Sequence, residues 1–208
     1  LAHLDSLPHS IFSCMFGAAS WSRTISDVAD VQIGPFGSLL HREDYVTGGV
    51  PLINPMHIQA GALQPNQEFA ITKEKAASLA QYRLQPGDVV LGRRGEMGRA
   101  GMALDEHDGM LCGTGSLILR PNGIDPVFLH AVVTSLRMKA HFERASLGAT
   151  MPNLNASLVK AAPCPLPTVA EQQTFAARLR QVKILRRNTV RALAADEALF
   201  ASIQSRAF

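Results

Sequence analysis

The sequence predicts an α+β fold in which a mixed, sheet-rich domain is followed by one long C-terminal helix able to form a coiled coil. In residues 168–208, apolar side chains recur at the spacing of one helix face, and arginine and glutamine occupy the other side. Residues 18–167 instead contain short apolar runs separated by turn residues, which is typical of strands. We expect the helix face to contact another helix through Phe175, Leu179, Val182, Leu185, Leu193, Phe200 and Ile203.

The chain begins with a second helical pattern. Residues 1–16 place apolar side chains on one face, but Pro8 is expected to break this helix near Ser6, and Gly17 to end it. The segment shares seven identities with residues 193–208, at a constant offset of 192 positions. We therefore expect the chain to be one period of a longer, internally duplicated protein, with a chance match between short helices as the alternative.

Turn residues separate the short apolar runs in the first half of the domain. They bound two expected strands at 31–33 and 50–54, and the first strand runs into a turn-rich loop at 34–38. Thr72 is then expected to cap a helix that reaches about Gln81, because its hydroxyl can accept a bond from the first helical turn.

The second half continues with strands and two helices. A buried strand at 89–91 leads into a basic, glycine-rich hairpin loop at 92–99, and further strands are expected at 110–112 and 116–120. Asp125-Pro126 opens a helix to about Leu147, and Asn155 caps a short helix that ends at Lys160. The core face of the first of these helices is expected to consist of Phe128, Val132, Leu136 and Phe142.

The final helix has a clear start. Thr168 with Glu171 three residues later forms the pattern of a capping box, in which each side chain accepts a bond from the other residue's backbone N–H. Pro163, Pro165 and Pro167 separate this start from the preceding domain.

Composition is that of an ordinary globular protein. The chain has 208 residues, 47% of them hydrophobic, and a net charge of only +3, which by itself does not indicate a polyanionic partner. No apolar run approaches the roughly 20 residues that span a membrane and no signal peptide pattern is present, so we expect a cytoplasmic protein without membrane contact. Three scattered cysteines, Cys14, Cys112 and Cys164, argue against a disulfide framework and fit a reducing compartment.

Common enzyme signatures are missing from the sequence. It contains no P-loop, no dinucleotide-binding fingerprint and no Gly-x-Ser-x-Gly nucleophile elbow. The histidines lack metal-ligand spacing, so we expect no catalytic residue, metal or cofactor. One enzymatic alternative stays open, a Mg²⁺-dependent nuclease that uses Asp105, Glu106 and Asp108, although a solvated acidic loop is the favoured interpretation.

Several loops suit DNA binding. Arginines on the glycine-rich loop could reach phosphate or guanine, and lysines at a helix start could reach phosphate. Asparagines could pair with adenine, although capping and turn roles are equally expected for them. Phe36 and Tyr45 could contact thymine methyl groups or sugars, but core packing is favoured for both. The candidate DNA-binding residues are Arg93, Arg94, Arg99, Lys73, Lys75, Asn153 and Asn155.

A series of motifs runs through nearly the whole chain. It comprises Gly34-x-Phe36-Gly37-Ser38, Asp44-Tyr45, Gly49-x-Pro51, Gly87-Asp88-Val89-Val90-x-x-Arg93-x-Gly95-x-x-Gly98, Leu119-Arg120-Pro121, residues 126–129, residues 148–155, Pro165-Leu166-Pro167 and Glu171-Gln172. In order and spacing these motifs resemble the specificity subunit of type I restriction-modification systems. Pro8 departs from the family pattern, in which a helix-forming residue stands at that place.

The resemblance implies two target recognition domains separated by two long helices, with each domain reading one half of a split DNA site and catalysis placed in other subunits. We therefore expect the end of a spacer helix at 1–17, a DNA target recognition domain at 18–167, and a spacer or dimerisation helix at 168–208. The implied partners are double-stranded DNA, the methyltransferase (modification) subunits, the restriction subunit through the complex, and a second copy of the chain along the C-terminal helix. The alternative outside this class is a protein-interaction scaffold or orphan regulator that has lost DNA specificity.

Overall fold

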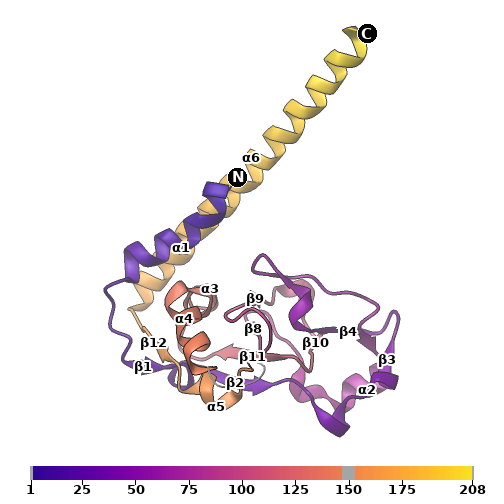
Figure 1. The fold of residues 1–208 in the computed structure, drawn as a ribbon, viewed down its shortest axis with the longest axis vertical. Coiled ribbons are helices and arrows are strands. Elements are labelled where there is room, and N and C mark those ends of the chain that lie inside the picture. The colour runs from indigo at the N-terminus through magenta and orange to yellow at the C-terminus, as the bar shows by residue number, and fades with distance from the viewer. Residues whose placement is uncertain (1, 147–152, 208) are drawn as a thin grey trace.

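The computed structural model describes residues 2–146 and 153–207 and confirms the predicted α+β class. A body of strands and short helices carries one long helix, α6 (Val169–Ala207), which projects away from it (Figure 1). Helix α1 (Ala2–Phe16) lies along the first part of α6, and the remainder of α6 extends beyond α1.

One antiparallel sheet forms the centre of the body. Its order is β2-β11-β8-β9, and the longest ladder pairs β11 with β2 over five residue pairs from Leu117↔Ile33 to Pro121↔Ala29. Strand β8 is buried along its whole length because it lies inside the sheet and packs on both faces. The bounds of the strands are Ala29–Ile33 for β2, Val89–Gly92 for β8, Ala100–Met102 for β9 and Ser116–Pro121 for β11.

A second sheet, of order β10-β4-β7-β3, stands beside the first (Figure 1). Only the β10–β4 pair is parallel in this sheet. Two short ladders complete the strands, one joining β1 to β12 and the other joining β5 to β6. The bounds are Arg23–Thr24 for β1, Tyr45–Val46 for β3, Val50–Ile53 for β4, Ile58–Gln59 for β5, Ala62–Leu63 for β6, Ala70–Ile71 for β7, Leu111–Cys112 for β10 and Pro163–Cys164 for β12.

The short helices largely match the predicted ones. Helix α2 (Lys73–Ser78) is capped by Thr72, whose hydroxyl accepts from the Lys75 N–H at 3.2 Å, and a 3-10 turn continues it through Tyr82. Helix α5 (Ala156–Lys160) starts at Asn155 as predicted. Further 3-10 turns lie at Ile25–Asp27, Gly37–Leu39, Arg42–Asp44, Pro55–His57 and Asp105–His107.

The single helix predicted from Pro126 to about Leu147 is wrong, because Ser135 divides it into α3 (Pro126–Thr134) and α4 (Leu136–Ala145). Ser135 adopts an extended backbone with ψ of 150°, and its hydroxyl accepts from the Met138 N–H at 3.2 Å, which caps α4. The new axis turns Leu136 to solvent, where it is 74% exposed, so its predicted place on the core face is also wrong. The other predicted core residues, Phe128, Val132 and Phe142, are buried.

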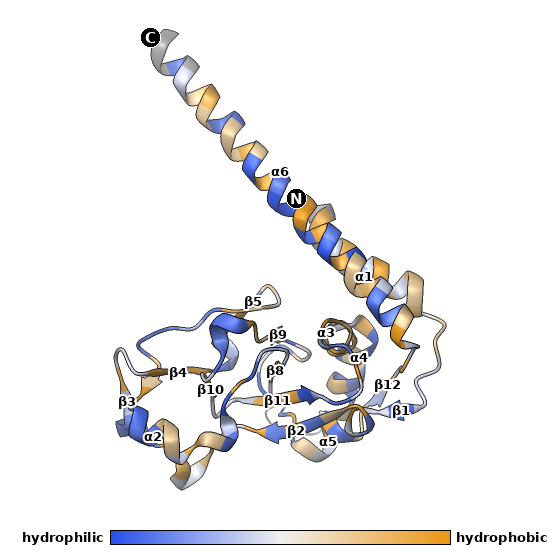
Figure 2. Cartoon of the chain, turned by 180° about the vertical axis from the view of Figure 1, so that it is seen from behind, coloured by the Kyte–Doolittle hydropathy of each residue, from blue (hydrophilic) through white to orange (hydrophobic). Residues whose placement is uncertain are grey.

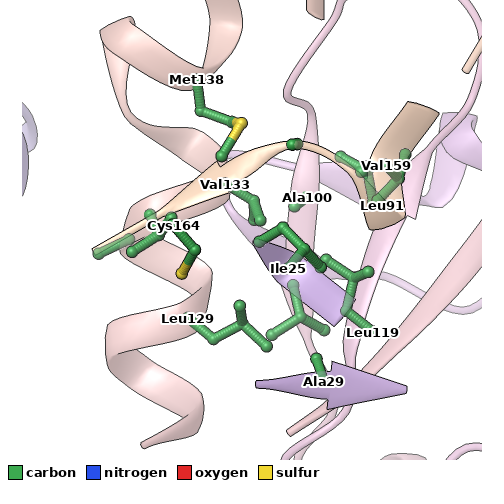
Figure 3. Close-up of a cluster of buried hydrophobic side chains, with 14 of the residues drawn as sticks. Ile25, Ala29, Leu91, Ala100, Leu119, Leu129, Val133, Met138, Val159 and Cys164 are labelled. Carbon is green, nitrogen blue, oxygen red and sulfur yellow. The ribbon is translucent and has the colours of Figure 1, made fainter. Parts of the chain in front are cut away.

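The main core lies between the central sheet, α3, α4 and α5. Figure 3 shows side chains from these elements meeting, including Leu91, Leu119, Leu129, Met138 and Val159, with Ile25 of a 3-10 turn among them. Two smaller clusters lie beneath the second sheet and the β5–β6 hairpin. The sequence pattern of short apolar runs therefore becomes several small cores that share the same strands.

Four phenylalanine rings attach the two long helices to the body. Phe12 and Phe16 of α1, Phe128 of α3 and Phe175 of α6 are buried, with ring centroids between 4.9 and 5.9 Å apart. We call this set the phenylalanine cluster. Pro8 lies inside α1 without breaking it, so the break predicted near Ser6 is wrong. A proline in a helix costs about 3 kcal/mol, and burial of two phenylalanines against α6 offsets that cost.

Polar contacts fix the start of α6. The predicted capping box is present: the Thr168 N–H donates to the Glu171 carboxylate at 2.8 Å, and the Glu171 N–H donates to the Thr168 hydroxyl at 3.3 Å. Gln172 is buried, accepts from the Asp125 N–H at 2.7 Å and donates to the Pro167 carbonyl at 2.9 Å. The first turn of α6 is therefore tied to the start of α3, which sets the direction in which α6 leaves the body.

Candidate nucleic-acid interface

Loops from both sheets converge at one place, next to the ends of β2, β4 and β8 and the start of β11. The Gly34 N–H donates to the Ser116 carbonyl at 3.1 Å, the Gly113 N–H to the Ile53 carbonyl at 2.9 Å, and the Arg93 N–H to the Gly115 carbonyl at 2.9 Å. These bonds join the loops that the sequence singled out at 34–38 and 92–99 to two others, at 54–57 and 113–115.

Three glycines make this convergence possible. A Cβ atom on Gly34 would lie 2.0 Å from the Gly113 carbonyl oxygen, and one on Gly113 would lie 2.2 Å from the Asn54 side-chain oxygen. A Cβ on Gly115 would lie 2.9 Å from the ring of Pro55. We call Gly34, Gly113 and Gly115 the glycine cluster, and it holds the loops at a separation that any side chain would prevent.

The first arginine of the hairpin loop is used structurally. Arg93 is half-buried, and its Nε donates to the Leu154 carbonyl at 2.8 Å, while the Leu154 N–H donates to the Arg93 carbonyl at 2.9 Å. Burial, and then the charge of Arg94, lowers the pKa of the Arg93 guanidinium. Arg93 therefore fixes the loop to residues 153–154, and only part of its guanidinium faces solvent.

The second arginine is exposed. Arg94 forms a backbone bridge with Asn153, which holds its main chain in place and leaves its side chain on the surface. An arginine on a fixed backbone loses less conformational freedom when it binds a planar anion or a base edge. Among the predicted arginines, Arg94 is the one best placed for a ligand.

The third arginine belongs to a small ionic network with an acid that the sequence analysis did not single out. Arg99 Nη2 lies 3.4 Å from one carboxylate oxygen of Glu96, and Lys139 Nζ lies 3.3 Å from the other. Lys139, and then Arg99, lowers the pKa of the Glu96 carboxyl. Arg99 also donates to the Pro55 carbonyl at 3.5 Å. All three charged groups are partly exposed, so the network is weak and can exchange partners.

The two asparagines differ in role. Asn155 accepts from the Leu158 N–H at 2.8 Å and so caps α5, which is the structural alternative given for it. The side-chain oxygen of Asn153 is buried and has no hydrogen-bond partner in the part of the chain that the structure describes. The rest of the predicted polar loop, residues 147–152, lies outside the described residues.

The two lysines lie on α2, beneath the second sheet rather than on the arginine loop. Lys73 is exposed, whereas Lys75 forms an ion pair with Asp44 at 3.1 Å. The same pair and the His41 N–H lower the pKa of Asp44, with the His41 bond as the larger cause. The structure therefore leaves Lys73 as the more available of the two cations.

The aromatic residues Phe36 and Tyr45 differ in burial. Tyr45 packs partly against the cluster beneath the second sheet, as favoured. Phe36 is 60% exposed, so the core role favoured for it is wrong. It stands in a loop whose backbone is fixed at Gly34, and it belongs to none of the buried clusters in the described residues.

The predicted helix face is divided along α6. Phe175 and Leu179 pack into the chain's own core, and Val182 is half-buried. Leu185, Leu193 and Phe200 are 47–62% exposed, and orange patches continue along α6 beyond the part that α1 covers (Figure 2). Nothing is described for the side chain of Ile203.

The acidic residues of the nuclease alternative, Asp105, Glu106 and Asp108, are exposed at the end of β9 that lies away from the arginine loop. Within residues 2–146 and 153–207, no three His, Cys, Asp or Glu side chains are grouped so that they could hold a metal ion. Over the same residues, none of the helices is both long and apolar enough to cross a membrane.

The fold and the loop cluster define a recognition domain that presents loops from the end of a sheet and is carried on a long helix. A family profile described as the type I restriction modification DNA specificity domain matches residues 20–190, so the chain belongs to this family. This confirms the resemblance found in the sequence.

Individual relatives agree with the family match. The specificity subunit of the type I restriction enzyme EcoBI from Escherichia coli is 25% identical over 194 residues, which cover 90% of this chain and 41% of that protein. The HsdS subunit from Thermoanaerobacter tengcongensis shares the fold with a TM-score of 0.63 at 18% identity, over 92% of this chain and 46% of that one. The S subunit from M. genitalium gives a TM-score of 0.56 at 16% identity, over 90% and 54% of the two chains. The chain thus spans about half the length of these relatives.

Proposed function

We propose that this chain is a sequence-specific recognition unit for double-stranded DNA in a type I restriction-modification complex, and that it reads one half of a bipartite site. One observation carries the proposal: in a chain of the DNA specificity family, an exposed arginine stands on a loop whose backbone is fixed to the end of a rigid sheet. Loops of this kind can present a forked guanidinium to phosphate or to the edge of guanine without large ordering costs.

The division of roles follows from the contacts. Arg94, with Lys73 farther away, supplies charge to the DNA, and Arg93 positions the loop through Leu154. Arg99 contributes when DNA phosphates replace Glu96 as its partner. Asn153 is bridged to Arg94 beside the same loop, and it would accept from a base amino group once its buried side-chain oxygen turns to the surface.

The proposed domain organisation assigns recognition to residues 18–167 and spacing to residues 1–17 and 168–208. The α6 helix keeps the recognition domain at a fixed distance and docks the methyltransferase subunits, through which the restriction subunit joins. The chain itself performs no covalent chemistry. This follows the division of labour that the family resemblance implies.

A second copy of the chain is the proposed occupant of the outer part of α6 when no second recognition domain is present in the same protein. The support is the exposure of several apolar residues along this part of α6, namely Ile184, Leu185, Val190, Leu193, Leu199 and Phe200. Two copies related by a twofold axis would read a symmetric, split site. Sedimentation of the wild-type chain and of a Leu193→Asp, Phe200→Asp variant tests this, and a wild type that stays monomeric at high concentration would contradict it.

DNA binding is tested with Arg94→Ala. We expect about a tenfold loss of affinity for a site selected from a random duplex pool, together with a salt dependence that is shallower by about one if Arg94 contacts a phosphate. The matched control is Arg178→Ala, an exposed arginine on α6, which should change affinity less than twofold. If the pool yields no preferred sequence while α6 still pairs, the scaffold alternative replaces this proposal.

A further inference from the structure

The exposed large apolar side chains of the body are not scattered evenly. Before α6, six of them are exposed in the described residues, and three belong to the two loops beside the glycine cluster. Phe36 is 60% exposed and Met56 is 55% exposed, with Leu39 nearby at 42%. The other three are on separate elements, at Leu104, Leu136 and Leu166.

Phe36 and Met56 each lie next to a residue that holds the backbone of its loop in place. Phe36 follows Gly34, which packs against Gly113. Met56 follows Pro55, whose ring lies against Gly115 and whose carbonyl accepts from Arg99 at 3.5 Å. The loops that carry these two exposed side chains therefore flank the short 113–115 turn, which is bonded to the arginine loop through the Arg93 N–H and the Gly115 carbonyl.

We propose that Phe36 and Met56 form an apolar surface that contacts the 5-methyl group of thymine in the major groove. This rests on the proposed function and names the chemistry that the site reads. In the major groove only the 5-methyl group of thymine is apolar among the base edges, and an apolar side chain distinguishes it from cytosine. The neighbouring arginines would hold phosphates or guanine, so that charge positions the duplex and the apolar pair selects the base.

DNA fits this surface better than a protein partner does. A stable protein interface buries about 800 Å² per partner, far more than two or three side chains on loops provide. The exposed Arg94 and the partly exposed Arg99 on the neighbouring loop match the phosphate chains that flank the major groove, and a small apolar area matches a methyl group.

The test removes single methyl groups from DNA. The full chain is used to select its preferred duplex from a random pool, and each thymine in turn is replaced by deoxyuridine, which lacks only the methyl group. We expect at least one replacement to weaken wild-type binding about three- to fivefold. The same replacement should have no effect on Met56→Ala or Phe36→Ala, because the contact is already absent.

A matched control is Leu104→Ala, an exposed leucine at the opposite end of the β8–β9 hairpin, which should keep the full uracil effect. Urea midpoints equal to wild type show that the exposed-site variants are folded. A uracil scan without effect, a selected site that lacks thymine, or an effect that persists in both variants overturns the inference. So does a variant that binds DNA normally but no longer co-purifies with the methyltransferase subunit. If the wild-type chain selects no sequence at all, the proposed function has failed and the inference fails with it, whereas selection without a methyl effect refutes the inference alone.

Discussion

Replacement of Phe175 by alanine would show whether the phenylalanine cluster anchors α6 to the body. The ring is fully buried and lies 5.7 to 5.9 Å from the rings of Phe12, Phe16 and Phe128. Loss of a buried phenylalanine costs about 3–5 kcal/mol, and ring pairs of this geometry each add about 0.5–1.5 kcal/mol beyond burial. Because three pairs are lost together and the cavity closes in part, we expect a destabilisation of about 4–5 kcal/mol.

Urea unfolding followed by circular dichroism measures this change. With an m-value of about 2 kcal/mol/M, the midpoint should fall by about 2 M. The control is Phe200→Ala on the same helix, where the ring is 62% exposed and the expected change is below about 0.5 kcal/mol at concentrations that keep the chain monomeric. A loss under about 1.5 kcal/mol, or equal losses in the two variants, would refute the anchoring role. Phe175→Leu, with a smaller expected loss of about 1–2 kcal/mol, replaces the alanine variant if that one does not fold.

Three further predictions concern polar groups. Asp88 is 1% exposed and accepts from Arg120 at 2.7 and 2.9 Å. Asp88→Ala should therefore lower the free energy of unfolding in urea by about 3–5 kcal/mol, and a loss below about 1 kcal/mol would contradict the pairing. Glu96→Gln releases two cations at the loop proposed to bind DNA, so affinity for random-sequence DNA should rise about two- to fivefold in fluorescence anisotropy at low salt. An unchanged or lower affinity would count against the network. Burial lowers the pKa of His57, only partly opposed by its bond to the Leu52 carbonyl, so below the ordinary pKa of 6.5 the unfolded chain takes up a proton more readily than the folded protein. Unfolding free energy should therefore fall as the pH drops from about 7 towards 5, and His57→Asn should flatten that profile.

The elements that the sequence predicted well are those with a local cause. The capping box at Thr168 and the caps at Thr72 and Asn155 form within three residues, so a single pattern identifies them. The strands at 89–91 and 116–120 could be predicted because each contains a short run of buried apolar residues, Val89–Leu91 and Leu117–Leu119. One error arose where a distant contact decides. Pro8 is tolerated because α6 packs against α1, and that contact joins the two ends of the chain.

Ser135 is a residue type that caps helices, but the apolar periodicity around it favours an unbroken helix. The apolar periodicity from Phe128 to Phe142 favours one helix, and a serine inside it costs little by propensity alone. The observed cap shows that the serine hydroxyl competes for the backbone and starts a new helix. Leu136 becomes exposed as a consequence, since the turn rotates the next residue away from the core.

For the candidate site, the sequence identified the loops but not the state of each side chain. Arg93, Arg94 and Arg99 are equivalent in a sequence motif, yet one is bonded to Leu154, one is exposed and one is paired with Glu96. Met56 lies in no motif that the sequence connects with DNA binding. The role proposed for Met56 depends on the packing of its turn against residues about 60 positions later. No local sequence pattern predicts that contact.

The arrangement separates the residues that hold the loops from those that can contact a ligand. The glycine cluster admits no Cβ atom. A substitution at any of its glycines would therefore displace several loops together and change how they are positioned on the sheet. Arg94, Phe36 and Met56 are exposed and contribute little to folding, so change there can alter what is contacted at small cost in stability. Under the proposed function, a domain built in this way would acquire a new target by substitution at a few loop positions, while α6 and its anchor in the phenylalanine cluster would keep it at the same distance from the proposed partners.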